Sequence, residues 1–359
     1  MSLTEQLKKG NERKHIYYFD YLRIIAMFSV VFMHVAAGPL RGIPFNGSWQ
    51  ILNLLTSFAF TAVPIFFMIS GYLIISDQHS DDIYRLLYKK IPRLLVPLAT
   101  WTVIAVVMYS YFDNTISVKT VIVGIMKSFR APVAIHFWYL YTLIAIYFIS
   151  PVLCNGIRHL SKQGKILVLA IVILTNIRAI LLALLPESLT VYTELDFVIK
   201  MEFFGAHLGT FILGYFLGTY NKKINTKLLI CIILITLSII SIGTYLRSVK
   251  AGSYNQVFQN QSAGFEVVLA GALFLLFKQN INIAHNSRII KTTIKLSLAV
   301  YLMHNLLISV FYHCGYMFNS MPQAILGTII VSIISTTSLW ITTKVKPICY
   351  ILTGTHYEK

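Results

Sequence analysis

The segment DYLRIIAMFSVVFMH, residues 20–34, decides the class of fold. It is apolar enough to lie in lipid, yet it carries Asp20, Arg23 and His34. A charged or titratable side chain is costly in hydrocarbon, so in a membrane helix it faces protein or water. The segment therefore predicts a membrane helix with a polar stripe that faces the interior of a helical bundle.

Similar apolar segments follow along the whole chain. Of the 359 residues, 57% are hydrophobic and 12% are charged, which is about half the charge of a soluble protein. Many apolar runs have roughly the twenty residues that cross a bilayer as a helix. We predict an all-α, polytopic integral membrane helical bundle with about ten transmembrane helices, near residues 21–38, 51–75, 94–112, 136–153, 165–185, 197–219, 227–245, 262–278, 292–312 and 324–344.

The formal net charge of +17 fits this class of protein. Most basic residues lie between apolar runs, where they orient helices against an anionic leaflet, so the bilayer and not a nucleic acid is the expected partner. Basic clusters occur in the N-terminal segment and after every second predicted span. The positive-inside rule then predicts a cytoplasmic N-terminal segment (1–15), a transmembrane domain (16–345) and a cytoplasmic tail (346–359).

One basic loop and the four cysteines also allow predictions. The loop with Lys119, Lys127 and Arg130 departs from the charge pattern, and its amphipathic sequence predicts a helix along the outer interface. The four cysteines are far apart and show no CxxC spacing, so neither a disulfide framework nor a metal site is expected.

Within the first span, Arg23 and His34 lie eleven residues apart. Eleven residues of α-helix return to nearly the same azimuth, about 16 Å further along the axis. Asp20 lies three residues before Arg23, close enough to pair with it on one turn. This face could line a path from the cytosol toward the outer leaflet. The alternative is that Arg23 reaches to the headgroups and His34 is a hydrogen-bonded core histidine.

Other polar residues in the predicted spans each have a functional and a structural interpretation. They are the deep His304 with Asn305 beside it, the residues His136, Trp138 and Tyr139 that open the fourth span, and Arg178 and Glu202. Aromatic residues at a span end are typical of an interfacial belt, and buried ion pairs can hold a bundle together. A catalytic or substrate-binding role is the alternative for each.

The stretch YKKIPRLLVP places Lys89, Lys90 and Arg93 at the start of the third span. Positive-inside charge accounts for them, but lysine and arginine also bind phosphate. This end of the bundle is therefore a candidate site for a phosphate-rich ligand.

Five segments together resemble the acyltransferase family 3 of membrane proteins, in this order: YFDYLRIIAMFSVVFMH, VPIFFMISGYLI, KKIPRLLVP, HFWYLYTLIAIYFISPVL and SLAVYLMH. The resemblance extends from about residue 16 to 345, nearly the length of the predicted bundle. It implies an O-acyltransferase that takes acetyl groups from cytoplasmic acetyl-CoA and places them on hydroxyls of extracytoplasmic or lipid-linked glycans. The implied location is the cell (plasma or inner) membrane.

The resemblance also implies roles for individual residues. Arg23 and His34 match the family's essential pair, and Lys90 and Arg93 match its cytoplasmic basic motif, which usually has two arginines. Lysine keeps the charge but lacks the bidentate fork of arginine. The phosphates of acetyl-CoA would then bind Arg23, Lys90 and Arg93, with Lys89 nearby, and the thioester would reach His34.

The chemistry leaves two mechanisms open. A neutral His34 can act as general base on a sugar hydroxyl, or it can take the acetyl group as a covalent intermediate. We favour the general base, which needs one transfer step. Asp20 would orient Arg23, and His304 with Asn305 would polarise the thioester carbonyl. The acceptor would contact His136, Trp138, Tyr139, Arg178 and Glu202.

Two other classes of function fit the polar membrane residues. A small-molecule or proton-coupled transporter of the same fold could use the histidines, Arg178 and Glu202 as a relay. No inverted-repeat hydropathy symmetry supports this interpretation. The other alternative is a glycan-export accessory protein without chemistry of its own. The sequence identifies neither the acceptor glycan nor the oligomeric state.

Overall fold

The structure is a computed structural model, and it describes residues 15–42, 44–186, 207–261, 264–281, 283–285 and 287–355. Every regular element in these ranges is a helix. Eight helical segments are long and apolar enough to cross a membrane: Tyr17–Gly42, Gly47–Ile75, Ile83–Phe112, Ile135–His159, Lys162–Leu184, Thr226–Ala251, Arg288–His313 and Met321–Thr342. The protein is therefore an all-helical membrane protein over the described ranges, as predicted.

The two remaining predicted spans are represented by shorter helices. α14 (Phe265–Asn280) has 16 residues and falls in the predicted span near 262–278. α12 (His207–Thr219) is the described part of the predicted span near 197–219, whose first half lies outside the described residues. The total of about ten spans and the side of the membrane on which the termini lie stay predictions.

The remaining elements follow in chain order. They are α2 (Tyr17–Gly42), α3 (Gly47–Ala59), α4 (Ala62–Ile75), α5 (Ile83–Arg85), the π-helix η1 (Leu86–Lys90), α6 (Pro92–Phe112), α7 (Val118–Ser128), the 3-10 turn η2 (Ile135–Phe137), α8 (Trp138–His159), α9 (Lys162–Leu184), α13 (Thr226–Ala251), α15 (Arg288–His313), α16 (Met321–Thr342) and α17 (Lys346–Thr353).

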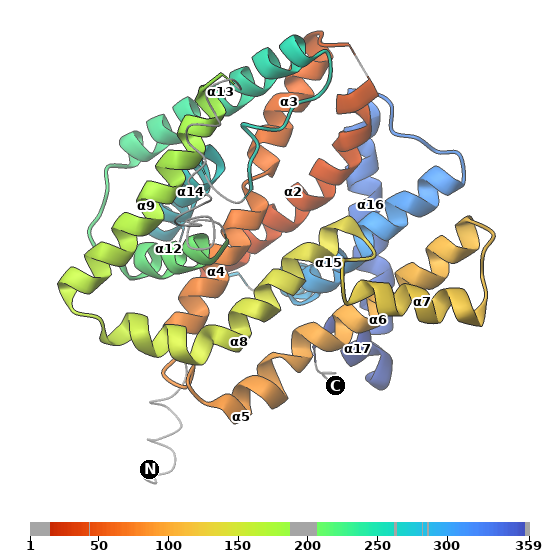
Figure 1. Ribbon diagram of the computed structural model, residues 1–359, viewed down its shortest axis with the longest axis horizontal. Coiled ribbons are helices and arrows are strands. Elements are labelled where there is room, and N and C mark those ends of the chain that lie inside the picture. The colour runs from red at the N-terminus through yellow and green to blue at the C-terminus, as the bar shows by residue number, and fades with distance from the viewer. Residues whose placement is uncertain are drawn as a thin grey trace.

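The central helix of the bundle is α2. It packs against α3, α4, α15 and α16, and it buries Leu22, Ala26 and Val30 among them. Figure 1 shows α9 and α13 on one side of the bundle and α6, α7 and α16 on the other, with α2 and α15 between them. Half of the residues of α2, Asp20 among them, are thus buried in the protein, and Arg23 and His34 are partly buried.

The closest helix contact is between α4 and α12. A Cβ atom at Gly71 would lie 1.7 Å from the carbonyl oxygen of Phe211, and one at Gly214 would lie 2.1 Å from that of Met68. Only glycine permits this approach, because both contacts are with backbone. Small residues that let backbones touch are a common basis of helix packing in membranes.

Two segments between or after the spans are also helical. α7 lies within the amphipathic stretch predicted as an interfacial helix, begins at a Ser117 cap, and packs on α6. The predicted tail 346–359 contains α17, which also packs on α6: the indole of Trp101 donates to the carbonyl of Leu352 at 3.0 Å. The C-terminal part of the described chain is therefore docked on the bundle.

Candidate active site

Three histidines from distant parts of the sequence form one cluster inside the bundle. His34 comes from α2, His136 from η2 at the start of α8, and His304 from α15. The ring centres of His34 and His304 are 5.1 Å apart, those of His136 and His304 4.9 Å, and those of His34 and His136 5.9 Å. Sequence analysis selected all three residues, and the fold brings them together.

The ring of His136 is held from both of its nitrogens. Nε2 donates to the carbonyl oxygen of Leu302 at 3.1 Å, and Nδ1 accepts from the Asn305 amide at 3.3 Å. The hydroxyl of Tyr301 donates to the backbone carbonyl of His136. Because no nitrogen of this ring is left for a ligand or a proton transfer, His136 is suited to position its neighbours.

His304 has the opposite property, an unpaired nitrogen in a fully buried ring. Its Nδ1 donates to the carbonyl of Val300 at 3.2 Å, one turn back in α15. Among the described residues its Nε2 has no hydrogen-bond partner, and the residue is 0% exposed. A neutral His304 therefore carries only an acceptor at Nε2. It cannot donate to a thioester carbonyl in this form, which argues against the role expected for it.

A cavity of about 390 Å³ opens on the cluster. His34 and Asn305 line it together with Trp138 and Tyr301, and Arg41, Gln256 and Gln261 form its further wall. Aromatic faces beside amide and hydroxyl groups are the surfaces that bind sugars, through stacking and hydrogen bonds. The chemistry of the cavity fits a polar, hydroxyl-bearing molecule next to His34.

A second cavity, of about 770 Å³, lies at the other end of α2 and α15. Arg93, Lys291 and Lys295 line it, and so does Asp20. His15 and Thr355, the first and last described residues, share its wall, so both ends of the described chain lie on this face of the protein. We call this space the basic cavity, and the space beside His34 the histidine cavity.

The two cavities share no lining residue but are joined by the same two helices. Lys295 and His304 lie nine residues apart on α15, about 14 Å along its axis. Arg23 is on α2 between Asp20 and His34, with its guanidinium within electrostatic range of the Tyr139 and Tyr147 hydroxyls. The two cavities are therefore separate spaces along the same pair of helices.

The sequence model of one known protein family matches this chain. The model is described as an acyltransferase domain, and the match covers residues 16–343. The chain belongs to acyltransferase family 3. Comparison with curated proteins and with solved structures gave no match. Membership of family 3 supports an acyltransferase with several membrane-spanning helices, and it confirms the resemblance seen in the five sequence segments.

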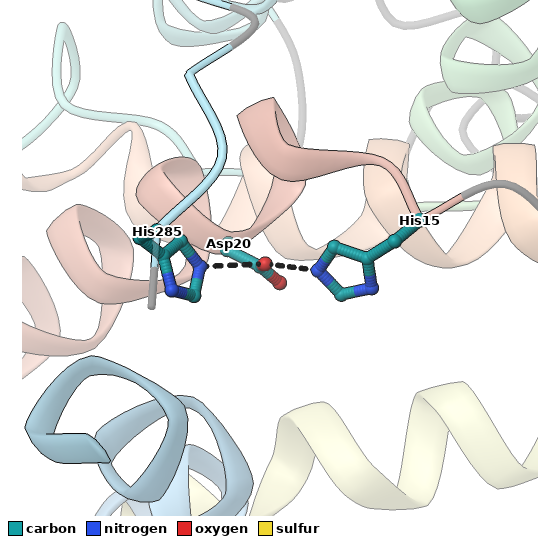
Figure 2. A group of neighbouring side chains, drawn as sticks. All are labelled: His15, Asp20 and His285. Carbon is teal, nitrogen blue, oxygen red and sulfur yellow. Dashed lines mark hydrogen bonds and ion pairs between the residues drawn. The ribbon is translucent and has the colours of Figure 1, made fainter. Parts of the chain in front are cut away.

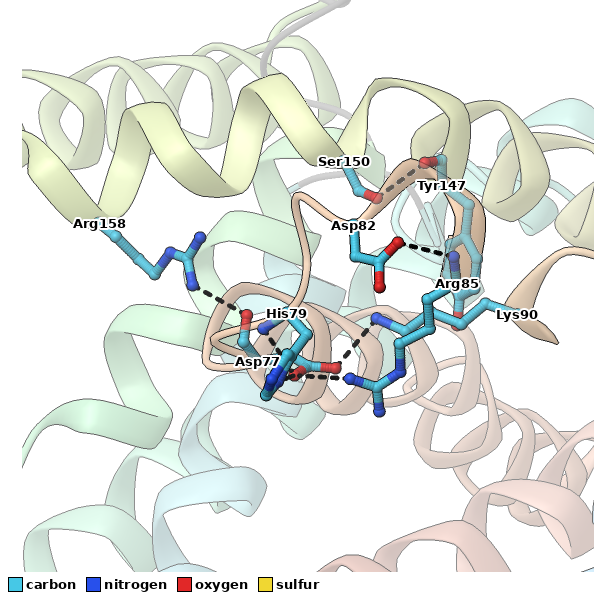
Figure 3. A network of polar contacts seen from close by, with 8 residues as sticks. All are labelled: Asp77, His79, Asp82, Arg85, Lys90, Tyr147, Ser150 and Arg158. Atoms are coloured by element: carbon cyan, nitrogen blue, oxygen red, sulfur yellow. Dashed lines mark hydrogen bonds and ion pairs between the residues drawn. The ribbon is translucent and has the colours of Figure 1, made fainter. Parts of the chain in front are cut away.

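The predicted coenzyme-binding lysines of this family 3 acyltransferase do not line the basic cavity. Lys90 donates to the buried carboxylate of Asp77 at 3.1 Å, and Arg85 lies 3.5 Å from the same group. Arg158 donates to the backbone carbonyl of Asp77 at 2.9 Å, which ties α8 to the end of α4 (Figure 3). Lys89 is exposed. Lys90 therefore holds this corner of the fold together, because a buried carboxylate needs a cationic partner.

Asp20 likewise makes contacts other than the one with Arg23 that was predicted for it. Its Oδ1 lies 4.0 Å from the Arg23 guanidinium, which is at the outer limit of an ion pair. Its Oδ2 instead accepts from His285 at 3.0 Å and also contacts His15. The carboxylate is thus bound mainly by two histidines that the sequence did not indicate.

Two predicted substrate residues of the family 3 protein, Tyr139 and Arg178, do not line the histidine cavity. Tyr139 is buried, packs on Phe67 at 4.8 Å between ring centres, and lines neither cavity. Arg178, on α9, lines neither cavity. Glu202 lies outside the described residues. Trp138, by contrast, lines the histidine cavity as predicted for an acceptor contact.

Sequence reasoning missed the residues that supply most of the basic cavity. Lys291 and Lys295 were assigned to the positive-inside pattern, and His15 and His285 were not considered. A signal was present in SRIIKTTIKL, where Lys291 and Lys295 are four residues apart and therefore on one helix face. Their placement next to Arg93 depends on the packing of α15 against α6.

Proposed function

We propose that this family 3 protein is an O-acetyltransferase of the cell membrane. It transfers the acetyl group of cytoplasmic acetyl-CoA to a hydroxyl of an extracytoplasmic or lipid-linked polysaccharide. The observation that carries the proposal is the histidine cluster, which borders a polar and aromatic cavity and shares α2 and α15 with a basic cavity at the other end.

The basic cavity supports the donor side of the proposal. Arg93, Lys291 and Lys295 supply cations for the phosphates of acetyl-CoA. The pantetheine arm is a thin chain of roughly 15–20 Å, comparable with the helical rise between the basic cavity and the cluster. Arg23, one turn along α2 from Asp20 of the basic cavity and about 16 Å before His34, would meet the end of the arm nearest the phosphates.

The histidine cluster supports the chemical step. The Nε2 acceptor of His304 can take a hydrogen bond from one nitrogen of His34, which leaves the other nitrogen of His34 unprotonated toward the cavity. That nitrogen removes the proton of the acceptor hydroxyl as its oxygen attacks the thioester carbonyl carbon. The carbon–sulfur bond breaks, and the CoA thiolate takes the proton from His34.

Asn305 is the best donor for the thioester carbonyl. Its amide gives one N–H to His136, and the same nitrogen carries a second N–H that can bond the developing oxyanion. The proposal thus gives to Asn305 alone the polarising role that was expected of His304 and Asn305 together. Trp138, Gln256 and Gln261 would hold the sugar ring of the acceptor.

The experiment that tests the proposal is a comparison of surface glycans. A deletion strain is complemented with the wild-type gene or with His34→Ala, and alkali-labile acetyl esters on its glycans are measured by mass spectrometry. The proposal expects esters only with the wild type. A transporter would leave the esters intact and would instead change solute uptake by membrane vesicles that contain no acetyl-CoA.

A further inference from the structure

Three metal-ligating side chains converge at the rim of the basic cavity. They are His15, just before α2, Asp20, in the first turn of α2, and His285, in the connection between α14 and α15. One ligand atom from each lies within 4.8 Å of the others. Figure 2 shows the Nε2 atoms of both rings directed at the carboxylate of Asp20 from opposite sides.

The residues around this group fix its geometry. The ring of Tyr17 packs against both His15 and His285, at 4.8 and 5.8 Å between centres. The Tyr21 hydroxyl donates to the carbonyl of Ile283 at 3.4 Å, so the segment that carries His285 is held on α2. A ligand set that its surroundings hold in place loses little freedom when a metal binds.

The charge of Asp20 also favours a cation between these groups. Its side chain is 2% exposed. Among the described residues, the arginine or lysine nearest to it is Arg23, at 4.0 Å. A buried carboxylate is costly unless a cation or several hydrogen-bond donors compensate it. Two neutral imidazoles and a carboxylate around one ion would satisfy it.

From this arrangement we infer that His15, Asp20 and His285 form a binding site for a divalent metal of the zinc class. Two imidazole nitrogens select zinc, cobalt, nickel or copper over magnesium and calcium, which prefer oxygen ligands. Around a tetrahedral ion with bonds of about 2.0 Å, ligand atoms lie roughly 3.3 Å apart. The three ligand atoms already lie within 4.8 Å of one another, so metal binding needs only a small adjustment of the side chains.

The fourth position of the ion faces the basic cavity, because all three ligands line it. Three protein ligands with one open position are typical of zinc sites that bind water or an anion. Arg93, Lys291 and Lys295 on the same cavity wall favour an anionic oxygen there over a further cation. The metal site does not depend on the proposed acetyl transfer.

The test measures metal binding to the full-length protein in detergent, purified through a tag without histidines and treated with a chelator. Zinc binding is followed by titration calorimetry, and the coordination is followed by the visible absorption of Co²⁺. We expect one ion per chain with a tetrahedral cobalt spectrum. His285→Ala and His15→Ala should each weaken zinc binding more than about 100-fold, since even second-shell changes cost about 10–100-fold.

His159→Ala is the matched control, because this exposed histidine bonds only its own helix, at the carbonyl of Asn155. His285→Cys separates loss of a ligand from loss of fold, because a thiolate ligand adds a sulfur-to-cobalt charge-transfer band. Equal zinc binding by the wild type and His285→Ala, or no such band in a folded His285→Cys protein, overturns the inference. Either outcome would mean that the two histidines and Asp20 are only hydrogen-bonded to one another and bind no metal.

Discussion

The rings of His34 and His304 lie 5.1 Å apart, and the buried Nε2 of His304 has no hydrogen-bond partner in the part of the chain that the structure describes. A buried acceptor nitrogen such as Nε2 of His304 is normally hydrogen-bonded to a donor. The adjacent ring is His34, which also lines the histidine cavity. In the proposed mechanism, His34 is the residue that meets substrate and His304 is the residue that orients it. The first two predictions separate these roles.

Replacing His34 by alanine should abolish acetyl transfer without changing the amount of protein in the membrane. General-base catalysis contributes about 10²–10⁴-fold. Two histidines of the described residues line the cavity, and both ring nitrogens of His136 are already hydrogen-bonded, which leaves His34 as the proposed base. The rate is measured as acetyl ester formed per amount of protein on an immunoblot. His313→Ala is the control, since that exposed ring stacks on Phe112 at the far end of α15. Full activity of His34→Ala would rule out the mechanism.

Replacing His304 by alanine should reduce transfer by about 5–100-fold and leave the KM for acetyl-CoA unchanged. The change removes one hydrogen bond that orients the base, worth about 1–3 kcal/mol, but no contact with the coenzyme phosphates. Steady-state kinetics in detergent measure both quantities. A raised KM with normal kcat would show that His304 binds the donor instead.

Arg93 and Lys90 should differ, although both belong to the same basic sequence motif. Arg93→Ala removes a cation from the basic cavity and should raise the KM for acetyl-CoA about three- to tenfold. Lys90→Ala removes a partner of buried Asp77 and should lower the free energy of unfolding by about 1–3 kcal/mol, with an unchanged KM.

Lys89→Ala is the internal control for this pair, because Lys89 is exposed and lines neither cavity. It should change neither the KM nor the thermal stability. If Lys90→Ala raised the KM as much as Arg93→Ala, the motif would bind coenzyme as a unit, contrary to the geometry of the two residues.

Gly71→Ala should destabilise the protein strongly. The added methyl group would lie 1.7 Å from the Phe211 carbonyl oxygen, so α4 and α12 must move apart, and overpacking of this kind costs about 1–3 kcal/mol or more. Gly156→Ala meets nothing within 4 Å and should be neutral or slightly stabilising. Thermal unfolding in one detergent compares the two, and equal melting temperatures would contradict the packing of α4 on α12.

The helices were predictable because hydropathy and length alone identify them. The segments around 21–38, 292–312 and 324–344 all recur as long apolar helices, since nothing in a bilayer competes with internal hydrogen bonding. His34, His136 and His304 were also identifiable, because a histidine deep in an apolar run stands out. The contact of these three histidines with one another was not predictable, because periodicity within one helix does not determine which helices pack together.

Two residues of the predicted site make long-range contacts that the sequence did not indicate. Lys90 was assigned to coenzyme from the family's basic motif, and in the structure it pairs with buried Asp77, from the turn after α4. Asp20 was paired with Arg23 on helical spacing, and besides that contact at 4.0 Å it has a closer one with His285, from the connection before α15. Local spacing identifies neighbours on one helix, and long-range contacts replace them wherever segments from different spans meet.

The backbones of α4 and α12 are in direct contact, so the two helices cannot separate without losing this packing. A bulky polymer is therefore not expected to reach His34 between them. The histidine cavity is bordered on another side by Gln256 and Gln261, in the non-helical connection that follows α13. On the proposed function, a glycan in the histidine cavity would meet Gln256 and Gln261, so substitutions in this connection should alter which glycans are accepted.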